Sequence, residues 1–309
     1  MSPRPSRHLA LTGGLCLALL TGCGSSTDSG EGGGDSAAPS PVKVVASTNV
    51  YGSIAAQIGG DHVEVTSIIS DPAQDPHSYE ADTRNQLAIS KARLVIENGG
   101  GYDDFVDRML KSGDNTSARK INAVEVSGKQ APAGGELNEH VWYDFPTVAK
   151  VADRIAAALS KADPDDAASF EKNAETFKAK LTPLESEEAQ IKKEHAGEGI
   201  GITEPVPLYL TEASGLVDRT PEEFSEAVEE GDDVSPKVLK ETLALYSGGK
   251  VRALVYNEQT SGPQTEKVKK AAESAGIPVV PVTETLPKGE DYVGWMTSNV
   301  IALSDALTR

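Results

Sequence analysis

The chain has 309 residues, of which 38% are hydrophobic and 25% are charged, so it is long enough to bury the cores of one or two globular domains. Its formal net charge of −18 at pH 7 argues against nucleic-acid binding, because that requires lysine and arginine to meet phosphates. An acidic balance of this size suits a protein with cationic partners, and it also suits one that uses charge for solubility alone.

The chain opens with a targeting pattern. Arg4 and Arg7 precede an apolar run over residues 9–20, which is too short for a comfortable membrane span. The segment Leu20-Thr-Gly-Cys23 that follows resembles a bacterial lipobox. We therefore expect residues 1–22 to be a lipoprotein signal peptide that is cleaved before Cys23. A lipid on Cys23 would then anchor the protein at the outer face of the bacterial cytoplasmic membrane.

The lipobox also removes one of the two cysteines, because Cys16 would leave with the signal peptide. The mature chain would keep a single cysteine, so we expect no internal disulfide and no thiolate cluster. Residues 23–41 are rich in Gly, Ser, Asp, Pro and Ala and have no apolar period, which is typical of a flexible tether.

The pattern changes at residue 42 to alternating strands and helices. The first half has predicted strands at 42–46, 63–69, 93–97 and 119–124, and predicted helices at 51–58, 83–91 and 103–111. This alternation indicates right-handed βαβ units around a parallel sheet. We expect residues 42–165 to form an N-terminal α/β lobe, which ends in a helix with Asp144 as N-cap and Pro146 in its first turn.

A long helix is predicted over residues 166–195. Phe170, Ala174, Phe177, Leu181 and Leu184 have the spacing of one helical face, whereas Pro183 should kink or break the helix. Residues 196–309 then resume the strand and helix pattern as a C-terminal α/β lobe, in which Ser235 is expected to cap one helix. The predicted fold class is α/β, with two lobes that each hold a mainly parallel sheet flanked by helices, joined by one long connecting helix.

Four residues with metal-binding side chains follow predicted strands or lie in strand-to-helix loops. Ligands of parallel sheets lie beyond the carboxyl ends of the strands, and each half contributes two such residues: His77, His140, Glu204 and Glu284. Two imidazoles and two carboxylates form a sensible ligand set for a divalent first-row metal, and the lack of thiolates argues against a soft-metal site. Glu258 is a candidate as an alternative ligand, ranked below Glu284, or as a hydrogen-bond acceptor that orients an imidazole.

The remaining candidates have simpler interpretations. His62 and His195 are expected on the surface. The acidic run over residues 222–233 could concentrate cations near a cleft, but we expect it to be a solvated loop. The glycine-rich runs at 32–34 and 99–101 lack the spacing of a phosphate-binding loop.

Several short motifs resemble one known family, the metal-binding receptor lipoproteins of manganese, zinc and iron ABC importers, also called cluster A-I solute-binding proteins. The similarity extends from about residue 42 to the C-terminus. It rests on Ser47-Thr-Asn with Ile54-Ala, Asp75-Pro-His-Ser-Tyr-Glu80, Glu139-His-Val-Trp142, Ile202-Thr-Glu204 with Tyr209, Gly215-Leu216, and Asp291-Tyr292 with Met296.

This resemblance implies two lobes, a rigid connecting helix and four metal ligands between the lobes. His77 and His140 match the two histidines of the family's N-terminal lobe. Glu204 matches a position that is histidine in many zinc-type members and glutamate in manganese-type members. Glu284 falls where the family usually has aspartate, and its additional methylene could change how the metal sits.

The resemblance implies a monomeric receptor that captures one divalent transition metal ion and delivers it to an ABC-type permease. The ion is expected to be manganese or zinc, with iron as a further option, and no catalysis is expected. The Irving–Williams order favours zinc at such a site, whereas the absence of a histidine-rich loop favours manganese. Two alternatives stay open: a secreted metalloenzyme of the hydrolase type, although no His-Glu-x-x-His pair is present, and a surface adhesin.

Overall fold

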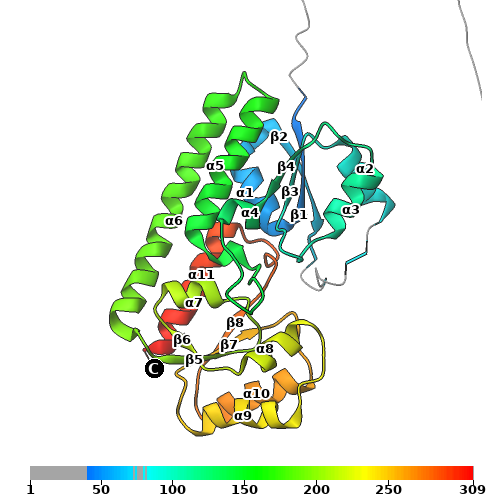
Figure 1. Cartoon of the computed structure of the whole chain (residues 1–309). Coiled ribbons are helices and arrows are strands. Elements are labelled where there is room, and N and C mark those ends of the chain that lie inside the picture. Colours follow the sequence, from blue (N-terminus) through cyan, green and yellow to red (C-terminus); the bar gives the residue numbers. More distant parts are fainter. Residues whose placement is uncertain (1–39, 72–73, 75–78, 81, 309) are drawn as a thin grey trace, which may run out of the picture. The chain divides into compact units, whose positions relative to one another are not determined.

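Two parallel four-stranded sheets organise the chain (Figure 1). The computed structural model describes residues 40–71, 74, 79–80 and 82–308. The N-terminal sheet has the order β2-β1-β3-β4 and the C-terminal sheet the order β6-β5-β7-β8, with every pair parallel. The strands are β1 Val42–Thr48, β2 Val63–Ile69, β3 Leu94–Glu97, β4 Arg119–Asn122, β5 Gly199–Ile202, β6 Val217–Asp218, β7 Leu254–Asn257 and β8 Val279–Val282. The predicted α/β class is confirmed.

Helices follow most of the strands, as the βαβ pattern requires. They are α1 Asn49–Gly59, α2 Thr83–Lys91, α3 Phe105–Ser112, α4 Ala123–Ser127, α5 Phe145–Ala162, α6 Ala167–His195, α7 Leu208–Ala213, α8 Glu222–Glu229, α9 Pro236–Ser247, α10 Pro263–Ser274 and α11 Tyr292–Leu307, with 3-10 turns η1 Gly60–His62 and η2 Val141–Tyr143. None of the helices in the described part of the chain combines the length and the apolar character needed to cross a membrane.

Side-chain caps set the starts of several helices. The carboxylate of Asp144 accepts a hydrogen bond from the Thr147 amide at 3.0 Å, and the hydroxyl of Ser235 accepts one from the Val238 amide at 3.3 Å. Both caps were predicted, because Asp and Ser satisfy amide groups that the first helical turn leaves unpaired. The predicted strand over 119–124 ends two residues early, since Asn122 instead caps α4 by accepting from the Glu125 amide at 2.9 Å.

Two helical segments depart from what the sequence led us to expect. Helix α6 is continuous through Pro183, which is exposed. Its predicted apolar face is buried throughout, and this packing outweighs the roughly 3 kcal/mol that an internal proline costs. The acidic run was expected to be a loop, but its first eight residues form α8, because Phe224 is fully buried and anchors the helix in the C-terminal core.

One hydrophobic core extends through both sheets. The same cluster of buried residues includes Ile96 of β3, Ile202 of β5, Phe177 of α6 and Trp295 of α11. Helix α6 packs along α5 and also contacts α1 and α11 (Figure 1). The N-terminal and C-terminal sheets are therefore linked by shared packing.

Polar contacts between the two halves add to this packing. The side chain of Asn49 makes paired hydrogen bonds with the backbone of Leu286, at 3.0 and 2.9 Å. The hydroxyl of Tyr143 donates to the Thr283 carbonyl at 2.8 Å. The last contact lies directly beside Glu284, so the C-terminal half of the predicted site is tied to the N-terminal half.

A buried carboxyl group on α6 predicts a pH-dependent stability. Glu188 is 6% exposed, and burial followed by the charges of Glu185 and Asp144 raises its pKa to about 8. Because the folded state holds the proton more tightly than the unfolded state, stability falls as the pH rises from about 4.5 towards 8. Glu188→Gln should remove this loss and stabilise the protein by on the order of 2 kcal/mol at pH 8, with little gain at pH 4.5.

Urea unfolding at several pH values measures this effect. Glu175→Gln is the matched control, because Glu175 lies on the exposed side of the same helix. A gain for Glu188→Gln that does not grow with pH would contradict the role of the buried carboxyl group.

Candidate metal centre

Three of the four predicted metal ligands lie among the described residues, and all three are buried. His140 is fully shielded from solvent, and Glu204 and Glu284 are each 2% exposed. Glu204 lies two residues beyond β5, Glu284 lies two residues beyond β8, and His140 directly precedes η2. The fourth predicted ligand, His77, lies outside the described residues, as does Cys23.

Asn138 determines which nitrogen of His140 can meet a metal. The side-chain oxygen of Asn138 accepts from the His140 backbone amide at 3.0 Å and lies 2.8 Å from ring Nδ1. The Asn138 amide group donates to the Pro205 carbonyl at 3.0 Å, which supports this orientation. Since a carbonyl oxygen only accepts, Nδ1 carries the proton and Nε2 of the neutral ring carries the lone pair that a metal ion requires.

A single amide brings the two glutamates together. Asn257 ends β7, and its Nδ2 donates to Oε2 of Glu204 at 2.5 Å and to Oε1 of Glu284 at 2.9 Å. Two carboxylates on the same nitrogen lie close enough to repel each other strongly when both are ionised. A divalent cation relieves such repulsion, and carboxylate oxygens are ligands for hard and borderline metals.

Further hydrogen bonds orient these carboxylates from both halves of the chain. The hydroxyl of Thr260 donates to Oε1 of Glu204. The hydroxyl of Tyr102 donates to Oε2 of Glu284 at 3.2 Å, and the Tyr102 ring packs edge-on against His140 with centroids 5.9 Å apart. Tyr102 therefore connects the histidine of the N-terminal half with a glutamate of the C-terminal half.

Glu258, the candidate for orienting an imidazole, directly follows a buried residue that contacts both glutamates. Glu258 is exposed, because it lies just past the end of β7, where the chain leaves the buried strand. Asn257, one residue earlier, is 1% exposed and bridges the two glutamates. Asn257 was not among the predicted site residues. Its position at the carboxyl end of a buried strand was the available signal.

A second acidic group approaches His140 from α8. Oε1 of Glu229 lies 3.7 Å from Nε2 of His140. Glu139, His140 and Glu229 each offer a ligand atom, and these atoms all lie within 4.8 Å of one another. Burial raises the pKa of Glu139 to about 7. Burial, followed by the charges of Glu139, Glu204 and Glu284, raises the pKa of Glu229 to about 9.

An acidic cleft of about 1600 Å³ borders this cluster. Glu139, Glu229 and Thr260 line it, together with acidic side chains from α8 and from the segment after α8. Lys267 is the only basic residue among the described residues that line the cleft. A cleft with this charge concentrates cations at its walls. This agrees with the alternative that the acidic run over residues 222–233 concentrates cations near a cleft.

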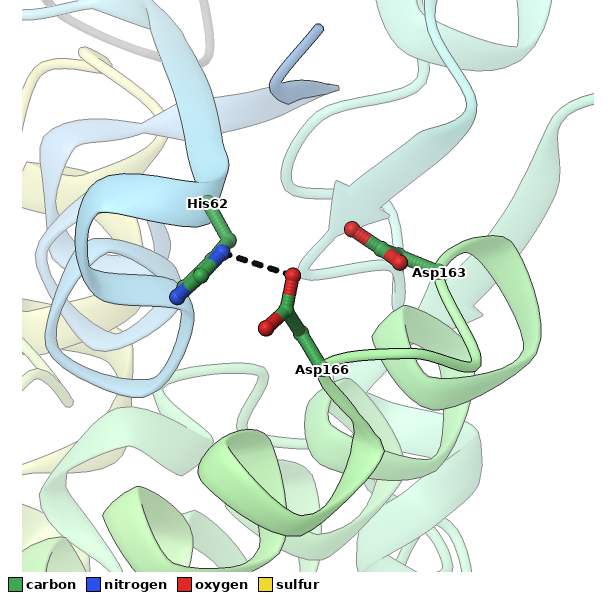
Figure 2. Close-up of side chains that lie close together, drawn as sticks. All are labelled: His62, Asp163 and Asp166. Carbon is green, nitrogen blue, oxygen red and sulfur yellow. Dashed lines mark ion pairs between the residues drawn. The ribbon is translucent and has the colours of Figure 1, made fainter. Parts of the chain in front are cut away.

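The other two described histidines lie at the two ends of α6. Figure 2 shows His62 with Asp163 and Asp166, where Nδ1 of His62 pairs with Oδ2 of Asp166 at 2.8 Å. Asp166 occupies the N-cap position of α6 but makes no capping bond there, so its carboxylate instead joins η1 to the start of α6. His195 ends α6 and pairs with Glu198 at 3.3 Å.

A protein-family model matches most of the chain. The model is described as ZnuA, the periplasmic component A of a zinc-uptake complex, and it matches residues 44–306. The chain belongs to the ZnuA family. The family resemblance inferred from the short motifs is therefore confirmed, and the family comprises metal-binding substrate-binding proteins of ABC transporters.

Some curated relatives of this ZnuA-family chain are named for manganese and others for iron. The chain is 33% identical over 169 residues to the manganese-binding lipoprotein MntA of Bacillus subtilis, a match that covers 54% of this chain and 53% of MntA. It is 24% identical over 315 residues to the manganese ABC transporter substrate-binding lipoprotein scaA of Streptococcus gordonii, covering 96% of this chain and 98% of scaA.

Solved structures agree on the fold. The Pseudomonas aeruginosa protein FpvC in complex with Mn²⁺ superposes with a TM-score of 0.72 at 20% identity, over 87% of this chain and 98% of FpvC. At this identity the likeness concerns the fold. The ZnuA-family chain thus shares the architecture of a protein whose solved structure contains manganese.

Proposed function

We propose that this protein is a receptor that captures one divalent transition metal ion and delivers it to an ABC-type permease. The proposed ligands are His140, Glu204 and Glu284 with His77, and the cargo is manganese or zinc, with iron as a further candidate. Family membership supports the class of function, and the relatives are substrate-binding components of transporters, not enzymes.

The observation that carries the proposal is the bridge made by Asn257. Its side-chain amide donates to both glutamates, and each of these is only 2% exposed. Two adjacent buried carboxylates are costly unless a cation or a proton compensates them. The neutral imidazole of His140, with Nε2 as its lone-pair nitrogen, supplies a third donor of the kind that divalent transition metals bind.

The proposed setting of the receptor follows from the sequence. Residues 42–165 and 196–309 would act as two lobes that share the ion, with residues 166–195 as the connecting helix. A lipid on Cys23 would hold a monomer at the outer face of the cytoplasmic membrane, and residues 23–41 would act as the tether. The names of the relatives support this setting, since both MntA and scaA are lipoproteins.

Elemental analysis of the purified protein tests the proposal. We expect about one manganese or zinc ion per chain after incubation with the metal and gel filtration. Glu204→Gln should lower this occupancy, since changing a group that only hydrogen-bonds to a ligand already costs about 10–100-fold in affinity, and the loss of a ligand should cost no less. His62→Ala is the control, because its cluster at the start of α6 also offers three ligand atoms. Clearly less than one metal ion per chain in folded wild-type protein would contradict the receptor function.

A further inference from the structure

Helix α8 presents one carboxylate to the proposed metal centre. Glu229 is the last residue of α8, and its Oε1 lies 3.7 Å from Nε2 of His140. Because Nδ1 donates to the side-chain oxygen of Asn138, Nε2 is the unprotonated nitrogen, which is the form that binds a metal. A metal ion bound to Nε2 would therefore lie within reach of Glu229.

The position of Glu229 is determined by how α8 is held at both of its ends. Phe224 is fully buried in the C-terminal core, and Ser225, one turn before Glu229 on the same face, is 5% exposed. After the helix, the Gly231 amide donates to the Val228 carbonyl and the Asp232 amide to the Ala227 carbonyl, at 3.2 and 2.7 Å. Gly231 has a φ of +72°, so this is a Schellman ending in which glycine is favoured.

The surroundings of Glu229 are unfavourable for an uncompensated negative charge. Its Oε1 is buried and has no hydrogen-bond partner in the part of the chain that the structure describes. Burial, followed by the nearby carboxylates of Glu139, Glu204 and Glu284, disfavours its charged form. The C-terminal end of a helix is also the negative end of its dipole, which disfavours an anion and favours a cation.

We propose that Glu229 is an additional ligand of the captured metal ion, contributed by α8, and that it favours manganese over zinc. This inference rests on the proposed receptor function. A further carboxylate oxygen beside His140, Glu204 and Glu284 raises both the number of ligands and the share of hard oxygen donors. Manganese accepts six oxygen-rich ligands, whereas zinc is satisfied by four, so the additional oxygen benefits manganese more.

Competition binding against a chelating fluorescent indicator tests the proposal on the full chain. Glu229→Gln keeps the shape of the side chain and removes the charge. Glu226→Gln is the matched control, since Glu226 lies on the same helix, lines the same cleft and is exposed. We expect Glu229→Gln to weaken Mn²⁺ binding by about 10–100-fold, in the range of changes at metal sites, and to weaken Zn²⁺ binding clearly less. Glu226→Gln should leave both affinities close to those of the wild type.

The outcomes separate this proposal from the receptor function. Equal and small losses for the two variants would overturn the role of Glu229 as a ligand, and so would equal losses for Mn²⁺ and Zn²⁺ in Glu229→Gln. If the wild type bound neither metal, the receptor function itself would fail. Thermal unfolding without metal checks the fold: Glu229→Gln should be at least as stable as the wild type, because it removes a buried acidic group that has no hydrogen-bond partner on Oε1 among the described residues.

Discussion

Replacing His140 with alanine should weaken the binding of Mn²⁺ and Zn²⁺ by more than about a hundredfold. The imidazole is the one nitrogen donor that the described part of the centre offers, and changing groups that merely support a ligand already costs about 10–100-fold. In the alanine variant, only Glu204 and Glu284, which share the amide of Asn257, are left as ligands in the described part of the centre. Isothermal titration calorimetry with each metal measures the loss.

His195→Ala is the control for this substitution. His195 ends α6 and pairs with Glu198, away from the cluster around His140. Its replacement should leave both affinities unchanged. Binding by His140→Ala that matches the wild type would show that the metal lies elsewhere, for example at His62, Asp163 and Asp166, and His62→Ala would then abolish it.

Saturation with metal should raise the midpoint of thermal unfolding by about 10 °C. A ligand that binds only the folded state adds about 4 kcal/mol at a thousand times its dissociation constant, and each kcal/mol shifts the midpoint by about 2–4 °C in a chain of this size. The physical source is the relief of repulsion between the carboxylates of Glu204 and Glu284, which burial makes strong. Differential scanning calorimetry of chelator-treated and metal-loaded protein measures the shift.

Magnesium at the same concentration is the control for this shift. Mg²⁺ has the same charge but dehydrates reluctantly and prefers to keep several of its waters, so a buried site with an imidazole suits it poorly. We expect little stabilisation by Mg²⁺. An equal shift with Mg²⁺ would mean that the acidic surface is responding to cations in general, and it would count against a specific centre.

The fold was largely predictable because its signals are local. Strand and helix alternation follows from apolar period, and the caps at Asp144 and Ser235 follow from the chemistry of single side chains. Helix α8 was missed because its acidic sequence is typical of a solvated loop. What makes it a helix is the burial of Phe224 against residues more than twenty positions away in the chain, which local patterns do not contain.

The candidate site was predictable only in part, for a different reason. His140, Glu204 and Glu284 could be located because they follow strands, whereas their mutual orientation depends on amides at Asn138 and Asn257. Glu258 was a candidate and Asn257 was not, although one step beyond a strand moves a side chain from the core to the surface. That His77, His140, Glu204 and Glu284 bind metal stays a prediction.

The core that runs through both sheets has a consequence for how the two halves can move and unfold. Because Ile96, Ile202 and Phe177 belong to one packed cluster, opening the two halves like a clamshell would expose apolar surface at about 25 cal/mol for each Å². Reorientation of short surface elements requires far less of this exposure. The two halves would therefore respond to heat or denaturant as one cooperative body.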